Sequence, residues 1–255
     1  MFGLWSSTTR QQRPGTVPAG RRVYAVGDVH GRDDLLGELL AAIEADNDAL
    51  PPATTSIVFL GDLIDRGPAS AAVVERLRTY QPRGIRPLFL AGNHEEVLLR
   101  LIAGQDEFLA DWLRFGGAEC LASYGVDAAP LRRMRPARAC AVVRGAIPPA
   151  HVEFLRSFAD TYRIGGYLFV HAGIRPGLPL DQQSQSDLRW IRRPFLDDSS
   201  DHGFIVVHGH TISAEVEEAP NRIGIDTGAY HSGTLTALVA EGAGRRYLQT
   251  GGIAE

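Results

Sequence analysis

The stretch Gly27-Asp28-Val29-His30-Gly31 follows the apolar run Val23–Val26, and two more segments of the same kind come after it. Gly61-Asp62-Leu63-Ile64-Asp65-Arg66-Gly67 follows Ile57–Leu60, and Gly92-Asn93-His94-Glu95 follows Pro87–Leu90. Each segment places carboxylate, amide or imidazole groups beside glycine, directly after a run with the composition of a β-strand. Their nearly even spacing is typical of strands that are joined by one helix each.

The residues between these segments carry the periodicity of helices. Apolar residues in Asp33–Ile43 recur at positions 35, 36, 39, 40 and 43, and Ser70–Arg78 repeats the pattern. The resulting β-α-β-α-β order predicts parallel strands, because a crossover helix returns the chain to the same end of the sheet. All three polar segments would then lie at the carboxyl edge, where open α/β sheets collect their ligands.

Beyond Glu95 the character of the sequence changes twice. Residues 96–163 are helical or irregular in pattern and are predicted to form an insertion within a domain that spans residues 21–255. From Gly166 onward β-prone runs return, and three late ones are close enough to pair as antiparallel strands: Arg222–Ile225, Thr234–Val239 and Tyr247–Gln249. We therefore expect an α/β fold with two mixed β-sheets packed together, flanking helices and a helical insertion.

The composition narrows the class of protein. The 255 residues, 44% hydrophobic and 22% charged, suit a globular protein with a sizeable core. The formal charge of −4 argues against nucleic acid or a membrane surface as partner. Residues 1–20 predict a flexible N-terminal arm rather than a signal peptide, and no run reaches transmembrane length. Because Cys120 and Cys140 fit no zinc or disulfide framework, we expect a cytoplasmic protein.

The polar side chains after the first three strands suit metal ions. Asp28 and His30 are two residues apart and can reach one ion. Asp62, at the end of the neighbouring strand, is placed to bridge to a second ion, and Asn93 offers that ion a neutral oxygen. Without thiolates the ligands suit Mn²⁺, which we expect, or else Fe or Zn²⁺.

Two later histidines would complete the second ion. His171 follows Tyr167–Val170 and His210 follows Phe204–Val207, while His208 is the alternative to His210. We prefer His210 because glycine precedes it and it lies farther out of the strand. Two divalent cations against two carboxylates leave a surplus of about two positive charges, which attracts a phosphate group and activates a bound water.

The motifs GDVHG, GDLIDRG and GNHE, in this order, resemble those of the metallophosphoesterases, specifically the phosphoprotein phosphatase (PPP) family of serine/threonine phosphatases. Later elements are similar to its bacterial members: His171 in HAG, Trp190-Ile191-Arg192, Gly209-His210-Thr211 and Asp226-Thr227-Gly228. The resemblance runs from about Val23 to about Val239. It implies the calcineurin-like metallophosphoesterase fold and a dinuclear centre with Asp28, His30 and Asp62 on one ion and Asp62, Asn93, His171 and His210 on the other.

The resemblance also implies catalytic roles. Arg66 and Arg192 would grip the phosphate oxygens, although Arg189 and Arg193 stand close to Arg192 in the sequence. His94, oriented by Asp65, would act as general acid after direct attack by a metal-bridging hydroxide. The implied activity is that of a metal-dependent phosphatase on phosphoserine or phosphothreonine in a protein or peptide.

Three alternatives stay open. A dinucleoside polyphosphate hydrolase of the diadenosine tetraphosphate type would use the same metal core, and a phosphatase of this kind could also act on phosphotyrosine. The basic residues of the insertion could face a polyphosphate or form a solvated surface, which we favour; they are Arg132, Arg133, Arg135, Arg138 and Arg144. A catalytically silent phosphopeptide-binding protein is disfavoured, because such proteins lack a ligand or the general acid and this chain has the full set.

Overall fold

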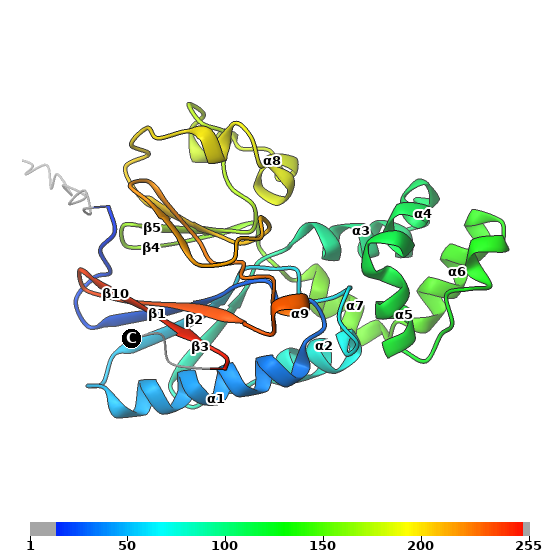
Figure 1. Ribbon diagram of the computed structural model, residues 1–255, viewed down its shortest axis with the longest axis horizontal. Helices are drawn as coiled ribbons and strands as arrows, with labels where there is room; N and C mark the ends of the chain where they lie inside the picture. The colour runs from blue at the N-terminus through cyan, green and yellow to red at the C-terminus, as the bar shows by residue number, and fades with distance from the viewer. Residues whose placement is uncertain (1–13, 252–255) are drawn as a thin grey trace, which may run out of the picture.

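Two five-stranded β-sheets form the centre of the computed structural model, which describes residues 14–251 (Figure 1). The first sheet has the order β10-β9-β1-β2-β3. Its strands are β1 (Arg21–Val26), β2 (Thr54–Phe59), β3 (Ile85–Phe89), β9 (Thr236–Glu241) and β10 (Gly244–Gln249). β1, β2 and β3 are parallel, as the crossover pattern predicts, whereas β9 and β10 run antiparallel to their neighbours.

The second sheet has the order β4-β5-β6-β8-β7. Its strands are β4 (Thr161–Ile164), β5 (Tyr167–Val170), β6 (Ile205–His208), β7 (Glu217–Ala219) and β8 (Arg222–Gly224). β5, β6 and β8 are parallel, and the edge strands β4 and β7 are antiparallel to their neighbours. The predicted α/β class with two packed mixed sheets is confirmed.

One predicted strand pairing is wrong. The sequence predicts that Arg222–Ile225 pairs antiparallel with Thr234–Val239, but β8 and β9 lie in different sheets. Only the two turn residues Pro220 and Asn221 separate β7 from β8, so β8 takes β7 as its antiparallel partner. The chain then crosses to the first sheet through helix α9 (Ala229–Ser232), and β9 pairs with β1 and β10.

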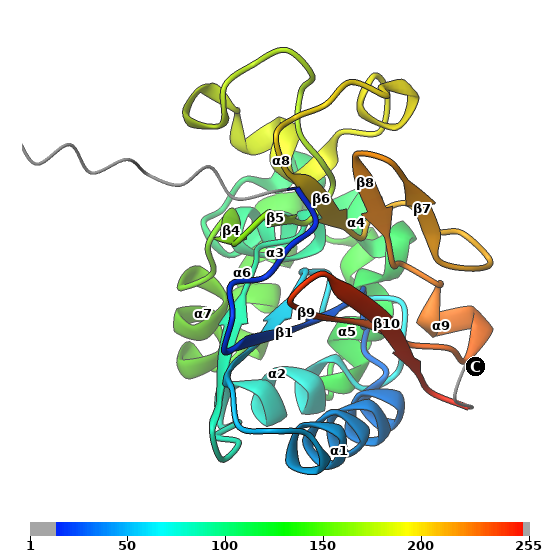
Figure 2. The same cartoon turned by 90° about the vertical axis from the view of Figure 1, so that its left-hand side faces the viewer.

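Helices cover the outer faces of the two sheets. The crossover helices α1 (Asp33–Ala49) and α2 (Ser70–Arg78) lie under the first sheet, and α8 (Gln185–Trp190) lies over the second (Figures 1 and 2). Five further helices gather at one end of the molecule: α3 (Asn93–Ile102), α4 (Leu109–Trp112), α5 (Ala118–Ser123), α6 (Pro136–Ala146) and α7 (Pro149–Arg156). From residue 96 of α3 onward they form the helical insertion. The last residues of the predicted insertion, 161–163, belong instead to the edge strand β4 (Thr161–Ile164).

The alternation of side chains along the strands explains the layers. On β1, Val23 and Ala25 belong to the cluster between the two sheets, while Tyr24 and Val26 belong to the cluster shared with the helices. Successive residues of a strand point to opposite faces, so a strand covered on both sides is apolar throughout. A third cluster packs the outer face of the second sheet against α8.

The N-terminal residues that the structure describes are packed rather than free. Gly15 N–H donates to Gly166 O, Gly166 N–H donates to Thr16 O, and Val17 N–H donates to Gly242 O, with Val17 buried. The arm predicted for residues 1–20 is therefore wrong for residues 14–20, and its first part, residues 1–13, lies outside the described residues. Between residues 14 and 251, none of the helices has the length and apolarity that crossing a bilayer requires.

Candidate metal centre and adjoining cavity

The sequence-predicted ligands converge because each follows a parallel strand at its carboxyl end. The strands come from both sheets, and the ligands that follow them are Asp28 and His30 after β1, Asp62 after β2, Asn93 after β3, His171 after β5 and His210 after β6. All six are buried. Their convergence is the outcome expected of side chains at the carboxyl edge of parallel strands.

The backbone at the site adopts conformations that side chains ordinarily avoid. Five non-glycine residues between positions 14 and 251 have φ in the left-handed region: His30 (44°), Asp62 (49°), Asp65 (70°), Arg66 (64°) and His210 (64°). Each such residue costs about 1 kcal/mol or more, and such strain collects at functional sites. All five are among the residues that the sequence analysis assigns to catalysis or metal binding.

Two glycines allow the backbone to approach the carboxylates closely. A Cβ atom at Gly92 would lie 2.1 Å from Asp62 Oδ1, and a Cβ atom at Gly209 would lie 2.0 Å from Asp28 Oδ1. Because glycine has no Cβ atom, backbone N–H groups can reach the two carboxylates. His94 N–H donates to Asp62 Oδ1 at 3.1 Å, and His210 N–H donates to Asp28 Oδ2 at 3.1 Å. Glycine before each of these ligand segments is thus a steric requirement.

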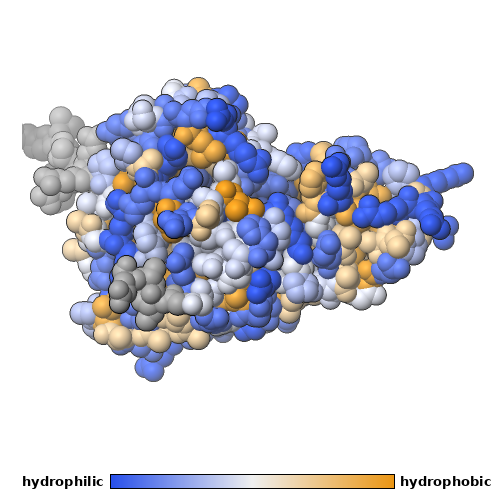
Figure 3. Space-filling view, in the orientation of Figure 1, coloured by the Kyte–Doolittle hydropathy of each residue, from blue (hydrophilic) through white to orange (hydrophobic). Residues whose placement is uncertain are grey.

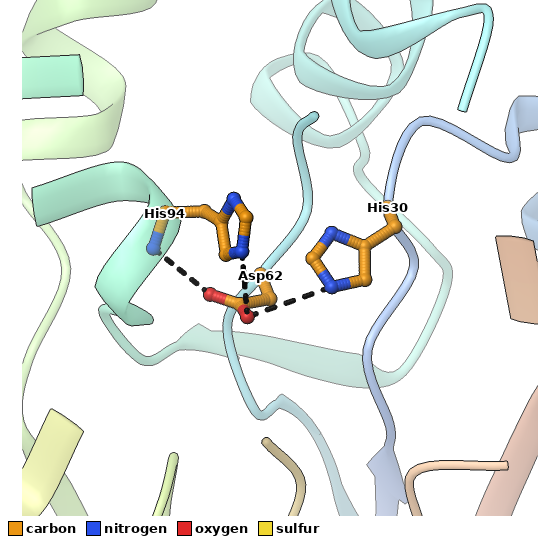
Figure 4. A group of neighbouring side chains, drawn as sticks. All are labelled: His30, Asp62 and His94. Atoms are coloured by element: carbon orange, nitrogen blue, oxygen red, sulfur yellow. Dashed lines mark hydrogen bonds and ion pairs between the residues drawn. The ribbon is translucent and has the colours of Figure 1, made fainter. Parts of the chain in front are cut away.

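Asp62 stands at the centre of the site. Its Oδ2 lies 3.6 Å from His30 Nε2 and 3.9 Å from His94 Nε2, so the two imidazoles approach one carboxylate (Figure 4). Its Oδ1 lies 3.4 Å from His171 Nε2. Two groups with metal-ligand spacing share this residue: His30, Asp62 and His94, and Asp62, His171 and His210. A carboxylate common to two groups is the arrangement that a bridging ligand requires.

The histidines present their Nε2 atoms to the site. His30 Nδ1 is 2.8 Å from Ile64 O, and His171 Nδ1 is 2.8 Å from Leu60 O, so a backbone carbonyl holds each ring by its far nitrogen. Such an outer hydrogen bond is typical of imidazoles that bind metal. His30 Nε2 and His210 Nε2 are buried with no hydrogen-bond partner among residues 14–251. Buried polar atoms without partners fit a site that takes cations.

The protonation states of the site residues also suit the binding of metal ions. Burial lowers the pKa of His30, of His171 and, to about 3, of His210, so these imidazoles are neutral at pH 7 and can coordinate metal. Burial, together with neighbouring carboxylates, raises the pKa of Asp28 and raises that of Asp226 to about 6. Crowded carboxylates of this kind are stabilised when divalent cations bind between them.

His94 is held in a different way. Its Nδ1 lies 2.7 Å from Asp65 Oδ2, and its Nε2 lies 3.2 Å from Arg66 Nη2. Burial alone would lower the pKa of His94, but the Asp62 and Asp65 carboxylates raise it to about 9. The imidazole therefore carries a proton at neutral pH, as a general acid requires.

The three neighbouring arginines are distinguished by their partners. Arg189 binds Asp160 at 2.6 Å, and Arg193 pairs with Asp197 at 3.1 Å. Arg192 instead points to the site, where its Nη2 donates to His210 O at 3.4 Å. Similarly, His208 packs its ring on Phe195 inside the second sheet, whereas His210 joins the ligand group. The geometry thus places Arg192 and His210 at the site.

A cavity of about 380 Å³ opens beside the metal centre. Its lining combines cationic and metal-site groups, among them Arg66, His94 and Arg192, with aromatic rings from the helical insertion and α8. The rings are Phe108, Trp112, Phe115 and Trp190. A smaller cavity of about 280 Å³ shares Arg66 and Phe115 with the first and is also lined by Arg114 and Tyr230, among others.

The basic residues of the insertion do not take part in either cavity. Arg132 donates to Leu113 O and Arg144 to Ile102 O, and neither these two nor Arg133, Arg135 and Arg138 line the cavities beside the site. Hydrophilic side chains project from the outer end of the insertion, where α6 lies, beside more apolar areas of the same surface (Figures 1 and 3). This supports the solvated surface favoured from the sequence.

Comparison with known proteins identifies the family. Residues 21–237 match the family described as calcineurin-like phosphoesterase, which is most of the chain. The chain is a calcineurin-like phosphoesterase. The fold that the sequence motifs imply is therefore confirmed.

Relatives of this phosphoesterase carry nucleotide-hydrolase names. It is 42% identical over 82 residues to a symmetrical bis(5'-nucleosyl)-tetraphosphatase of Acidovorax sp. (strain JS42), but the match covers 32% of this chain and spans only 26% of that relative's length. It is 25% identical to the asymmetrical bis(5'-nucleosyl)-tetraphosphatase PrpE of Anoxybacillus flavithermus, with 84% of this chain and 88% of that one covered. The crystal structure of a putative diadenosine tetraphosphatase shares the fold, with a TM-score of 0.64, 23% identity, and 93% and 98% coverage.

Family membership implies divalent metal ions, and the two groups around Asp62 can hold them. Three residues near these groups have no role in the sequence analysis. Glu95 accepts hydrogen bonds from the N–H groups of Asp62, Leu63 and Gly92, and it thereby fixes the turn that carries Asp62. Its place in GNHE, directly after His94, was a usable signal.

Asp226 and Trp112 are the other two residues near the ligand groups that have no role in the sequence analysis. Asp226 follows β8, a strand parallel to β6, and its buried Oδ2 has no hydrogen-bond partner in the described part of the chain. The sequence analysis includes it in the resemblance, as Asp226-Thr227-Gly228, but assigns it no role. Trp112, in α4, donates its indole N–H to Asp65 Oδ2 at 2.9 Å. No local motif marks Trp112.

Proposed function

We propose that this calcineurin-like phosphoesterase hydrolyses dinucleoside polyphosphates of the diadenosine tetraphosphate type. The observation that carries the proposal is the lining of the larger cavity, which combines cationic groups at the metal centre with four aromatic rings. A nucleotide has matching parts, a phosphate chain and a flat base, and bases stack on aromatic side chains. The names of the relatives support the same substrate.

The exposure of the aromatic rings supports a base-binding role. Phe115 is 55% exposed and Trp190 is 40% exposed, and they are two of the four large apolar side chains that stay exposed among the described residues. Exposed rings that meet in one cavity are typical of ligand sites. The smaller cavity, which shares Arg66 and Phe115 with the larger one and is also lined by Arg114 and Tyr230, offers space for a second nucleotide unit.

The proposed metal centre holds two divalent ions, with Mn²⁺ as the expected metal. Asp28, His30 and Asp62 would hold the first ion, and Asp62, Asn93, His171 and His210 the second. His171 Nε2 already lies 3.0 Å from Asn93 Oδ1, which brings two of these donors together. When bound, such ions polarise a phosphoryl group and activate water for attack.

The side chains of this chain supply the remaining chemistry. Arg66 and Arg192 bind phosphoryl oxygens and offset the charge that develops there. His94 is placed to give a proton to a departing oxygen that is basic enough to need one, and Asp65 keeps the imidazole in the orientation this transfer needs. Arg66 is itself oriented by the Tyr230 ring, whose centroid lies 4.9 Å from the guanidinium carbon.

The test is an assay of diadenosine tetraphosphate beside a phosphoserine peptide, with the purified protein and added Mn²⁺. We expect faster hydrolysis of the dinucleotide. Chromatography of the products shows which bond breaks, because symmetrical cleavage yields two molecules of ADP and asymmetrical cleavage yields ATP and AMP. Hydrolysis of the phosphopeptide without hydrolysis of the dinucleotide would contradict the proposal.

A second candidate is the phosphoserine or phosphothreonine phosphatase activity that the sequence motifs imply. One observation favours it: Asp65 Oδ2 lies 2.7 Å from His94 Nδ1 and so orients the imidazole to give a proton to a poor leaving group such as a serine oxygen. A polyphosphate leaving group departs with less help. The same assay separates the two candidates, and a phosphotyrosine peptide added to it tests the broader activity.

A further inference from the structure

The helical insertion reaches the proposed proton donor through one side chain. The Trp112 indole N–H donates to Asp65 Oδ2 at 2.9 Å, and the same oxygen lies 2.7 Å from His94 Nδ1. Trp112 is 3% exposed and Asp65 is fully buried. One carboxylate oxygen therefore joins a residue of α4 to the imidazole at the metal centre.

The same insertion also holds the backbone of the turn that carries Asp65. Arg66 N–H donates to Gly116 O at 3.2 Å, four residues after Trp112 in the chain. Gly116 has φ of +117°, and a Cβ atom there would lie 2.4 Å from Arg66 N. A Cβ atom at Gly117 would lie 2.2 Å from the Trp112 ring. Only glycine permits this close fit, so the turn and the insertion pack as one unit.

The hydrogen bond decides how firmly the carboxylate is held. Asp65 and Arg66 both have left-handed φ, so the turn is strained and needs its surroundings to keep its conformation. A buried carboxylate that receives a donor from each side keeps one rotamer, and its partner imidazole is oriented with it. Without the indole N–H, Asp65 would keep His94 as its partner but lose the donor that fixes its own direction.

We propose that Trp112 is a positioning residue for proton transfer by His94, acting through Asp65, and that the helical insertion is in this way a part of the catalytic apparatus. The inference rests on the proposed role of His94 as proton donor. It goes beyond that role because it assigns to the insertion an effect on the chemical step, in addition to any contact with substrate.

The test compares Trp112→Phe with the unchanged protein, loaded with Mn²⁺, on phenyl phosphate and 4-nitrophenyl phosphate. The two substrates differ in how much their leaving groups need a proton, because phenolate is far more basic than 4-nitrophenolate. We expect kcat for phenyl phosphate to fall roughly 10-fold, the effect of losing one hydrogen bond to a charged group, while kcat for 4-nitrophenyl phosphate changes less than about 2-fold. KM should change little for either substrate.

Tyr80→Phe is the control. It also removes a hydrogen bond from an aromatic side chain to a carboxylate, but that carboxylate is Glu44, at 2.8 Å, and neither residue lines the cavities beside the site. The ratio of the two rates should stay at the value of the unchanged protein. In an Asp65→Ala background, adding Trp112→Phe should have no further effect on the ratio, since the residue through which Trp112 acts is absent.

Replacing the Trp112 indole with benzothiophene, by incorporation of the corresponding amino acid, keeps the shape of the ring and substitutes sulfur for N–H. This second variant gives an answer even if Trp112→Phe folds poorly, and circular dichroism checks the folding of both. Equal loss on the two substrates, or an unchanged ratio in the folded variants, would overturn the inference. His94→Asn separates the two proposals: if it slows both substrates equally, the role of His94 fails, and if it is selective while the Trp112 variants are not, only the inference about Trp112 fails.

Discussion

The carboxyl edge of the sheets and the helical insertion meet at one site but differ in construction. At the edge, rigid strands deliver Asp28, Asp62 and His210 into fixed positions, and short glycine-containing motifs mark them in the sequence. The insertion brings Trp112 and Phe115 from short helices and tight turns without any motif. The comparison shows that local motifs mark the residues positioned by strand ends, whereas the residues positioned by the insertion are recognised only from their contacts in the fold.

Asp62→Asn is the strongest test of the edge. Asparagine keeps the shape of the side chain but removes the charge shared by the two ligand groups, so we expect activity to vanish on every substrate. Elemental analysis should show fewer bound metal ions. Asp46→Asn, which alters a carboxylate bonded to Tyr24 and Arg246 instead of the site, is the control. Full metal content in an active Asp62→Asn protein would mean that the shared carboxylate is not a ligand.

His94→Asn tests whether the edge also supplies the proton. We expect hydrolysis of a phosphoserine peptide to slow by about 10²–10⁴-fold, because its leaving oxygen is strongly basic. Diadenosine tetraphosphate and 4-nitrophenyl phosphate should be much less affected, since their leaving groups depart without a proton. Steady-state rates on the three substrates measure this. A uniform loss would assign His94 to metal binding, which its place in one ligand group also permits.

Phe115→Ala and Trp190→Ala test the insertion and α8 as the base-binding surface. Stacking of a base is worth about 1–3 kcal/mol, so KM for diadenosine tetraphosphate should rise roughly 5- to 100-fold. The small substrate 4-nitrophenyl phosphate should show no such rise. Leu178→Ala removes another exposed apolar side chain, 40% exposed and outside the cavity, and should leave both substrates unaffected. If KM rises equally for both substrates, the two rings do not bind the base.

The smallest expected effect is the change with pH in the free energy of unfolding of the metal-free protein. The pKa of His94 is about 9 in the folded chain and about 6.5 in an unfolded one. Because the folded pKa is the higher, this stabilisation is complete below pH 6.5 and is lost as pH rises through 9. We expect the free energy of unfolding to fall by about 2–3 kcal/mol between pH 7 and 9. Urea titrations measure it, and His94→Asn should be flatter over this window.

The sequence was most informative where local pattern and fold agree. The helix pattern over Ser70–Arg78 matches α2, and the run Tyr167–Val170 matches β5 residue for residue. The three motifs after β1, β2 and β3 identify side chains that the structure brings together. These predictions succeed because strand alternation, helix periodicity and glycine position are all encoded within a few neighbouring residues.

What sequence reasoning missed depends on distant residues. The sheet to which β8 belongs is determined by its pairing with β6 and by the two-residue turn after β7, and the site role of Asp226, which follows β8, depends on that placement. Trp112 is connected to the site by its hydrogen bond to Asp65, which lies 47 residues earlier in the chain. The packing of residues 14–17 against Gly166 and Gly242 likewise comes from contacts at large sequence separation. A single sequence carries no local signal for such contacts.

The five left-handed residues have a consequence for protein engineering. At His30, Asp62, Asp65, Arg66 and His210, glycine would relax the main chain, so selection for thermal robustness alone would favour losing these side chains. Selection for stability alone would thus yield variants that have lost activity, unless catalytic turnover is screened in parallel. Stabilising changes are better sought in α6, at the outer end of the insertion.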